Sequence, residues 1–314
     1  MIERQAAELQ RLAQLDLSEI ADRLRGCRRV VLVGTGTSQH AAELGALMLS
    51  DAGVNALASP SAAFARGHLP FGKGDGLVVI SHTTETAYAQ RSRTRALEAG
   101  VPLVSVTGRV GSWPEAVETV GREESETYTV SYTATLAVLT LLAGELGSPS
   151  YTREALAAAL PAVEEVLRND AHTAVPMPAR AVAVVGAGPW AVTAREGALK
   201  LRESARMLAE GFDAEYFLHG SAVPLCAADG VVLLQPSADP DGLVAALGQA
   251  AQAEGIPASV LSVDSGSLPP VLAQIPLTVV LQRLAERWAG MRGQNPDVAI
   301  VGAWADQRLW ELGG

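Results

Sequence analysis

The stretch that decides the fold is Leu77-Val78-Val79-Ile80-Ser81-His82-Thr83-Thr84-Glu85-Thr86. It begins with four apolar β-formers and ends in a cluster of hydroxyl side chains, and the helix-compatible segment 87–99 follows directly. The stretch therefore predicts a strand, a turn and a helix N-terminus. Such a junction offers backbone N–H groups, a positive helix-dipole end and O–H donors to one anion. We expect Ser81, Thr83 and Thr86 to be these donors.

A single hydroxyl after a strand is usually part of a turn or a helix cap, because Ser and Thr are common in both places. Here four hydroxyl residues stand within six positions, and a cap needs only one of them. We therefore favour phosphate binding over capping. We also expect Thr84 to resist a positive φ, because it is β-branched, and so to give the loop its own shape.

Length and composition favour two compact domains. The chain has 314 residues, of which 48% are hydrophobic and 18% charged, which is typical of globular protein. The net charge of −10 gives no electrostatic footprint for nucleic acid or for an anionic membrane surface. Cys27 and Cys226 form no CxxC pair, which argues against a zinc knuckle or a disulfide framework.

The N-terminal 25 residues are interpreted as one amphipathic helix. They lack the apolar region of a signal peptide, and no apolar run in the chain reaches about 18 residues. We expect a cytoplasmic protein with no membrane contact.

Strands and helices alternate along the first half. A strand at 30–33 leads into a glycine-rich turn and a helix at 41–49 that Ser38 could cap, and the helix after residue 87 ends at Gly100 before a strand at 101–106. This alternation predicts a parallel sheet with helices on both faces.

The pattern then starts again. Gly188 follows Gly36 by 152 residues, the strand-like run at 231–235 follows that at 77–81 by 154, and 255–260 follows 100–105 by 155. Three landmarks in register indicate an internal duplication of two α/β domains, divided within about 150–170. Because the second copy has Pro236 in place of the hydroxyl cluster, we expect only the first domain to bind the anion.

A dinucleotide site is the competing interpretation of Gly34-Thr35-Gly36. The third glycine of the fingerprint is absent, since Gln39 stands there, and no acidic residue follows the run 56–59. We therefore set a nicotinamide aside and expect neither a cofactor nor a metal.

The turn Gly36-Thr37-Ser38 and the loop 81–86 resemble the motifs of the sugar isomerase (SIS) family, whose loops hold the phosphate of a sugar phosphate. The resemblance implies that the phosphate is bound by Ser38, Ser81, His82, Thr83 and Thr86, and the sugar by Gly36, Thr37, Glu126 and Ser131. His82 stands where the family often has glutamine.

Residues 196–203, with 209–210 and 218–220, are similar to segments shared by the isomerase half of glucosamine–fructose-6-phosphate aminotransferase and stand-alone aminosugar-phosphate deaminases and deglycases. The resemblance implies two tandem SIS domains, each a flavodoxin-like parallel sheet flanked by helices. The expected divisions are an N-terminal helix at 1–27, a phosphate-binding domain at 28–160, a catalytic domain at 161–290 and a C-terminal tail at 291–314. No glutamine-hydrolysing domain precedes residue 28, so we do not expect the chain to make its own ammonia that way.

Glu196, Lys200 and Glu203 stand at i, i+4 and i+7, which places them on one helical face. Proton transfer between sugar carbons needs a base and a cation near the enediolate oxygen. By resemblance Glu203 is the base, Lys200 holds the reacting oxygens and His219 opens the ring, a task that suits an unperturbed pKa of about 6.5. The plain alternatives are a solvated Glu–Lys pair and a turn histidine.

Two further segments resemble the family less closely. The register of Glu126 is open, and Ser131 or Thr133 could equally be a helix N-cap. The motif Asn295-Pro296-Asp297 is present, but residues 298–314 contain no lysine, although family members commonly have one there. Transamination becomes less expected than isomerisation or deglycation, and 304–310 is interpreted as a packing segment.

Two functions remain open. The first is an enzyme that acts on a hexose or aminohexose 6-phosphate by C1–C2 proton transfer, with isomerisation, deamination and deglycation sharing the first step. The other is a non-catalytic sugar-phosphate sensor. The resemblance also implies a homodimer, in which His219 reaches the partner subunit's site.

Overall fold

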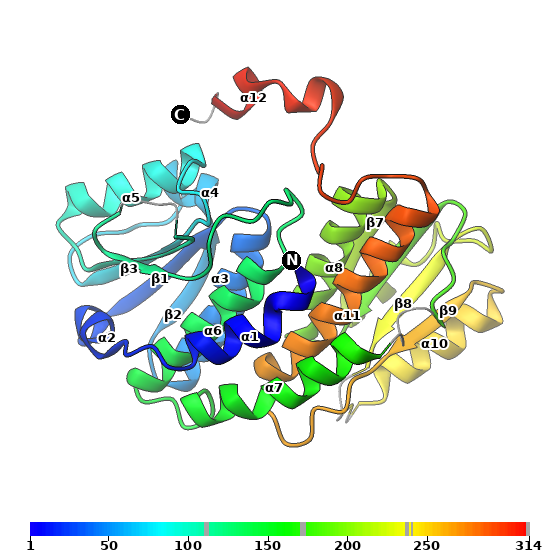
Figure 1. The fold of residues 1–314 in the computed structure, drawn as a ribbon, viewed down its shortest axis with the longest axis horizontal. Coiled ribbons are helices and arrows are strands. Elements are labelled where there is room, and N and C mark those ends of the chain that lie inside the picture. The colour runs from blue at the N-terminus through cyan, green and yellow to red at the C-terminus, as the bar shows by residue number, and fades with distance from the viewer. Residues whose placement is uncertain (110–112, 170–173, 236–238, 240, 312–314) are drawn as a thin grey trace.

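The computed structural model describes residues 1–109, 113–169, 174–235, 239 and 241–311. Two parallel sheets lie at opposite ends of the molecule, with a layer of helices between them (Figure 1). The first sheet has the order β2-β1-β3-β4-β5 and the second β7-β6-β8-β9. The α/β class and the parallel sheets predicted from the alternating pattern are confirmed.

The first sheet places the hydroxyl loop. Its strands are β1 (Arg29–Gly34), β2 (Ala56–Pro60), β3 (Asp75–Ile80), β4 (Leu103–Thr107) and β5 (Ala116–Glu118). Its helices are α3 (Thr37–Asp51), α4 (Ser61–Ala65) and α5 (Ala87–Ala99), and α5 ends at Gly100 with a φ of 61°. Since β1 and β3 are neighbours in register, the turns after them lie side by side at the same edge of the sheet.

The second sheet is built from β6 (Ala181–Gly186), β7 (Leu208–Asp213), β8 (Gly230–Leu234) and β9 (Ala258–Leu261). Its helical segments are α8 (Trp190–Ala205), α9 (Ala214–Tyr216), the π-helical η3 (Phe217–Ser221) and α10 (Leu243–Ala253). In each sheet the first strand in the chain lies between the second and the third.

The two sheets share a further feature. Asp75, at the start of β3, accepts hydrogen bonds from Arg28 and Arg29 just before and in β1. Asp229 stands just before β8 and accepts hydrogen bonds from Arg180 just before β6. Each buried aspartate thus joins the starts of two adjacent strands, in matching positions of the two sheets.

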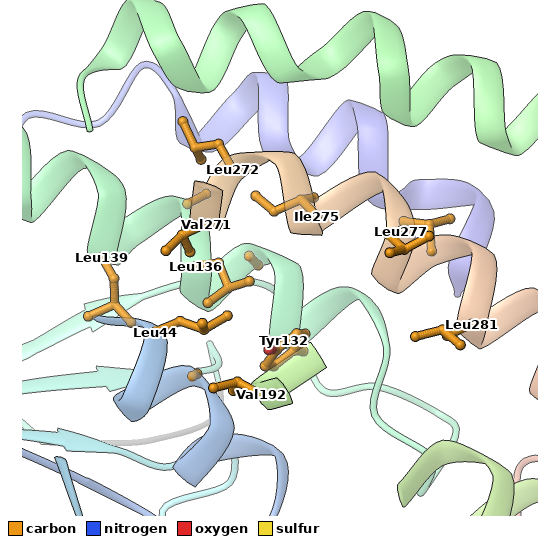
Figure 2. Close-up of a cluster of buried hydrophobic side chains, with 14 of the residues drawn as sticks. Leu44, Tyr132, Leu136, Leu139, Val192, Val271, Leu272, Ile275, Leu277 and Leu281 are labelled. Atoms are coloured by element: carbon orange, nitrogen blue, oxygen red, sulfur yellow. The ribbon is translucent and has the colours of Figure 1, made fainter. Parts of the chain in front are cut away.

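One apolar core joins the two sheets through their helices. Figure 2 shows part of it, with Leu44 from α3, Tyr132, Leu136 and Leu139 from α6 (Val130–Glu145), Val192 from α8, and five side chains from α11 (Pro270–Met291). Helix α7 (Arg153–Arg168) packs on α11 and α6. The long apolar helices α6 and α11 therefore fix the two sheets relative to each other.

The two chain ends are less regular than expected. Residues 1–25 form a short 3₁₀ turn η1 (Ile2–Arg4) and two helices, α1 (Gln5–Leu12) and α2 (Ser18–Leu24), so the prediction of one helix was wrong. The side chain of Asp16 accepts the N–H of Ser18 in the break, as Asp does in turns. The C-terminal residues form η4 (Gly302–Ala305) and α12 (Gln307–Glu311).

Candidate functional site

A cavity of about 670 Å³ opens at the edge of the first sheet where β1 and β3 end. It is lined by the turn after β1, the loop after β3, the segment before α6, one face of α8 and the C-terminal residues. Ten of the predicted site residues line it: Gly36, Thr37, Ser38, Ser81, His82, Thr83, Thr86, Glu126, Ser131 and Glu203. Lys200 and His219 are not among the lining residues.

The loop after β3 leaves two of its hydroxyls free of capping. Thr86 is the N-cap residue of α5, but its side chain makes no capping hydrogen bond. Ser81 is buried, and its Oγ has no hydrogen-bond partner within the described part of the chain. Thr83 Oγ1 accepts the N–H of Glu85 at 3.3 Å. Helix capping of α5 therefore does not account for the hydroxyls of Ser81 and Thr86.

Thr84 contradicts our expectation, because it has a φ of 62°. Its Oγ1 donates to the carbonyl of Thr83 at 2.6 Å, and its own carbonyl accepts Nε2 of Gln90 at 2.9 Å. These bonds hold a β-branched residue in the left-handed region, at a cost of about 1–2 kcal/mol. The loop thus takes the shape that a glycine would give it.

His82 lines the cavity as a partly buried ring. Its Nε2 accepts the N–H of Glu123 at 3.4 Å, and its ring meets Tyr128 edge to face at 5.4 Å. Burial lowers the pKa of His82, and Arg122 adds to this while Glu123 opposes it. A ring that accepts at Nε2 carries its proton on Nδ1, and this atom is buried against Gly108 without a hydrogen-bond partner among the described residues.

The turn after β1 brings the chain close to α3. A Cβ on Gly34 would lie 2.3 Å from the backbone carbonyl of Ser38, so only glycine allows this approach. Gly36, with a φ of 57°, is the N-cap residue of α3, and it makes no side-chain cap. The prediction that Ser38 caps this helix was therefore wrong, because Ser38 is already its second residue.

The face of α8 that points to the cavity carries a buried charge cluster. Nζ of Lys200 lies 2.7 Å from Oε2 of Glu203 and 3.5 Å from Oε1 of Glu196. Glu196 and Lys200 are almost wholly buried, whereas the Glu203 side chain is 19% exposed and reaches the cavity. The predicted common face is confirmed, and these residues are not a solvated surface pair.

Burial dominates the electrostatics of this cluster. It raises the pKa of Glu203, an effect that the Lys200 ammonium only partly offsets. Burial alone would lower the pKa of Lys200, but the carboxylates of Glu196 and Glu203 raise it overall. The cluster thus combines a permanent cation with a carboxylate that holds its proton more tightly than usual, which suits a base that works near neutral pH.

His219 lies elsewhere in the same chain. It is exposed in η3, next to Gly220, whose φ is 106°, and lines a different recess with Tyr216 and Glu210. The structure therefore does not bring His219 to Glu203 within one chain.

The segment before α6 holds a residue that sequence reasoning missed. The Glu123 carboxylate accepts the N–H groups of Thr129 and Ser131, at 3.1 and 2.7 Å, and so caps α6. Ser131 and Thr133 are inside the helix, so neither is its N-cap. Nothing in the sequence favours Glu123 over its neighbours Glu124 and Glu126. Only its burial in the structure distinguishes it from them.

Glu126 faces the C-terminal segment. Its Oε2 accepts the N–H of Ala299 at 2.9 Å, and its own N–H donates to the carbonyl of Asp297 at 3.0 Å. The segment after α11 turns back toward the first sheet (Figure 1). Its residues Ala299, Ile300, Ala305 and Trp310 line the cavity. Because Trp304 is 75% exposed and Trp310 59%, the prediction of a packing segment was wrong.

Two more residues at the site were not predicted. Nδ1 of His40 lies 2.6 Å from Oε2 of Glu196, and Arg122 lines the cavity in an exposed pair with Glu85 at 3.3 Å. His40 follows Thr37 by one helical turn, so the spacing of the two could have indicated a shared face. Nothing in the sequence marks Arg122.

Neither a candidate metal site nor a candidate membrane-spanning helix is found among the described residues. Within them, no group of three or more His, Cys, Asp or Glu side chains is arranged to hold a metal ion. No helix in the described ranges is both long and apolar enough to cross a membrane.

Residues 23–144 match the family model of the SIS domain. Over 312 residues the chain is 28% identical to a glutamine–fructose-6-phosphate aminotransferase of Pyrococcus horikoshii, an alignment that covers 89% of this chain and 52% of that protein. The chain therefore spans about half the length of this relative.

Solved structures that share the fold include two that cover nearly the whole of this chain. The C-terminal domain of glucosamine-fructose-6-phosphate aminotransferase from Francisella tularensis has a TM-score of 0.80 at 19% identity, with 95% of this chain and 96% of that chain covered. Tagatose-6-phosphate ketose/aldose isomerase from Escherichia coli has a TM-score of 0.77 at 19% identity, with 97% and 95% covered.

Proposed function

We propose that this protein binds a hexose or aminohexose 6-phosphate in the cavity and moves a proton between C1 and C2, with Glu203 as the base. One observation carries the proposal. A single cavity joins the hydroxyl loop after β3 to the partly buried carboxylate of Glu203, whose pKa is raised. The hydroxyl loop suits a phosphate, and the carboxylate suits an enediol-type proton transfer. The loop follows β3 and the carboxylate belongs to α8, and both line the same cavity.

The phosphate is bound by Ser81, Thr83 and Thr86 together with the N-terminus of α5. In this arrangement the Ser81 hydroxyl, which has no hydrogen-bond partner among the described residues, gains one, and so does the Thr86 hydroxyl, which makes no capping bond. Ser38 and His82 lie beside them on the cavity wall. Gly36, Thr37, Glu126 and Ser131 are assigned to the sugar.

Lys200 stabilises the developing negative charge. Its Nζ lies behind Glu203, outside the cavity lining, and is buried between two carboxylates, so its attraction for an enediolate oxygen acts through a region that excludes water. The names of the relatives agree with this chemistry, since one is a ketose/aldose isomerase and the other an isomerizing aminotransferase. Isomerisation, deamination and deglycation remain alternatives, because they share this first step.

The second sheet is proposed to be a second SIS domain, related to the first by duplication. The strand orders agree, Gly36 and Gly188 have φ values of 57° and 56°, and the buried Asp75 and Asp229 hold arginines in matching places. These three features are supporting observations, and the proposed divisions remain at residues 28–160 and 161–290.

A homodimer would complete the site. His219 is exposed on η3 and beyond the cavity of its own chain, so a second copy would have to receive it. Mixing His219→Ala subunits with Glu203→Gln subunits should then restore part of the activity that each variant lacks. Failure of mixed, demonstrably dimeric samples to regain activity would refute a shared site.

A non-catalytic sensor is the second candidate, and two observations favour it. His219 lies outside the cavity, and residues 298–314 provide no lysine. A sensor would bind the sugar phosphate without turning it over.

The test compares Glu203→Gln with the unaltered protein. An enzyme should lose turnover in this variant and keep its affinity for the sugar phosphate, measured by calorimetry, because the amide keeps the shape of the carboxylate but cannot take a proton. The matched control is Glu254→Gln, at the exposed end of α10, which should leave both unchanged. Equal turnover in Glu203→Gln and the unaltered protein would contradict the role of Glu203 as the base.

A further inference from the structure

A buried chain of polar contacts connects the two sheets through α3 and α8. Nδ1 of His40 on α3 lies 2.6 Å from Oε2 of Glu196, whose Oε1 lies 3.5 Å from Nζ of Lys200. Lys200 in turn donates to Glu203 at 2.7 Å. His40 is thus linked to the proposed base through two intervening side chains, although it does not line the cavity itself.

The direction of the first hydrogen bond follows from charge. Burial pushes the pKa of Glu196 upward, but the charge of Lys200 and the hydrogen bonds from His40 and Thr37 bring it below its ordinary value. An ionised carboxylate has no proton to donate, so Nδ1 of His40 carries the proton and donates it. His40 therefore stabilises a negative charge that has almost no contact with solvent.

We propose that His40 is a positioning residue for Glu203, acting through Glu196 and Lys200. While Glu196 remains a carboxylate, the positive charge of Lys200 interacts with both Glu196 and Glu203, and it fully compensates the negative charge of neither. Glu203 then remains basic enough to accept a carbon-bound proton. This inference rests on the proposed role of Glu203 as the base, which it deepens.

The same contact sets the geometry of the cavity. Thr37 also donates to Glu196, from Oγ1 to Oε1 at 3.2 Å, and Thr37 lines the cavity beside the phosphate loop. Glu196 on α8 thus receives two donors from α3 and lies beside Lys200 on its own helix. The bonds of Thr37 and His40 to Glu196 therefore fix α3, beside the phosphate loop, relative to α8, which carries the proposed base Glu203.

Several other charged or titratable groups lie near the cluster and must be considered in any pH experiment. These are Arg202 on α8, Glu123 before α6, Tyr132 in α6, Glu43 on α3, and Arg283 and Glu286 on α11.

One of these groups provides a matched control. Glu43 on α3 forms an ion pair with Arg195 on α8, at the same helix–helix contact, but neither residue bonds to Glu196. Glu43→Gln therefore disturbs the α3–α8 contact and leaves the His40–Glu196 bond in place. A merely structural role for His40 would give the same result as this control.

The decisive measurement is the titration of the Glu203 carboxyl carbon by NMR, in ligand-free protein labelled at the glutamate side chains. In His40→Leu, Glu196 loses a donor and takes up a proton more readily. Its negative charge, which raises the pKa of Glu203, is then weakened, and Lys200 acts on Glu203 alone. The Glu203 midpoint should move to lower pH by about half a unit or more.

His40→Asn is the rescue variant, because its amide nitrogen can donate from near the position of Nδ1. It should keep the midpoint close to that of the unaltered protein, and Glu43→Gln should as well. An unchanged midpoint in His40→Leu, or the same shift in Glu43→Gln, would overturn the proposal. Should His40→Leu fail to fold, the isosteric Glu196→Gln must produce the same downward shift, and its failure to do so is equally decisive.

This readout does not depend on turnover. If the unaltered protein proves inactive on every sugar phosphate, the proposed function fails while the Glu203 titration still tests the role of His40. If the protein is active, the acidic limb of the kcat/KM profile should move with the NMR midpoint, and kcat should fall roughly 10- to 100-fold in His40→Leu. A fall in kcat with an unmoved acidic limb would count against the proposal.

Discussion

Nζ of Lys200 lies 2.7 Å from Oε2 of Glu203, less than one turn along α8, in a position where the lysine is buried and the glutamate still reaches the cavity. The pair therefore places a fixed positive charge behind a carboxylate that faces the ligand space. The predictions below follow from this arrangement and from the loop across the cavity.

The acidic limb of the activity profile reports on Glu203. Because burial raises the pKa of this carboxyl group, the base is ionised only at a higher pH than an ordinary glutamate. We expect kcat/KM to rise with pH through a midpoint above 4.5, the ordinary value, and not below it. A rate that stays constant down to that pH would contradict Glu203 as the base.

Ser81→Ala should weaken phosphate binding without harming the fold. Its Oγ has no partner in the described structure, so its removal leaves nothing unpaired. Loss of one hydrogen bond to a charged phosphate should weaken affinity by roughly 10- to 100-fold, measured by calorimetry.

The matched control for Ser81→Ala is Ser105→Ala on the adjacent strand β4. Ser105 donates to Glu115 at 2.9 Å and does not line the cavity. This variant should lose thermal stability and keep its affinity. The proposed phosphate site in the loop is refuted if Ser81→Ala keeps the affinity of the unaltered protein while Ser105→Ala loses it.

Thr84→Gly should stabilise the protein, because it relieves a β-branched residue held at a φ of 62°. The gain in free energy of unfolding should reach about 0.5–1 kcal/mol after the entropic cost of glycine is subtracted. Urea denaturation measures it. A clear loss of stability would show that the Oγ1 hydrogen bond to Thr83 outweighs the backbone strain.

Glu123→Ala should destabilise α6, since the carboxylate accepts two N–H groups that would otherwise be buried without partners. The expected loss is about 2–3 kcal/mol in the free energy of unfolding. Glu124→Ala, at the exposed neighbouring position, should change it by less than about 0.5 kcal/mol. Equal effects of the two substitutions would refute the capping role.

Local pattern was sufficient to predict most of the first sheet. The apolar run before Ser81 and the glycine at 100 mark the ends of β3 and α5, and both ends were predicted correctly. The start of α3 was predicted too late in the sequence. Gly36 takes a φ of 57° and is the N-cap residue, so the helix already begins at Thr37. Periodicity cannot report such a dihedral angle.

The site was predictable where chemistry and spacing coincide along the chain. The common face of Glu196, Lys200 and Glu203 follows from helical geometry alone. His40 was missed because its partner Glu196 is 156 residues away, and Glu123 because burial alone distinguishes it from Glu124 and Glu126. Contacts made by tertiary packing leave no local signal.

The most direct test of the central claim is solvent-deuterium incorporation at C2, followed by NMR over a panel of hexose and aminohexose 6-phosphates. The unaltered protein should exchange the C2 proton of at least one of them, and Glu203→Gln should bind that sugar phosphate without exchanging it. Binding without exchange by the unaltered protein for every member of the panel would contradict the proposed enzyme and leave a sensor in its place.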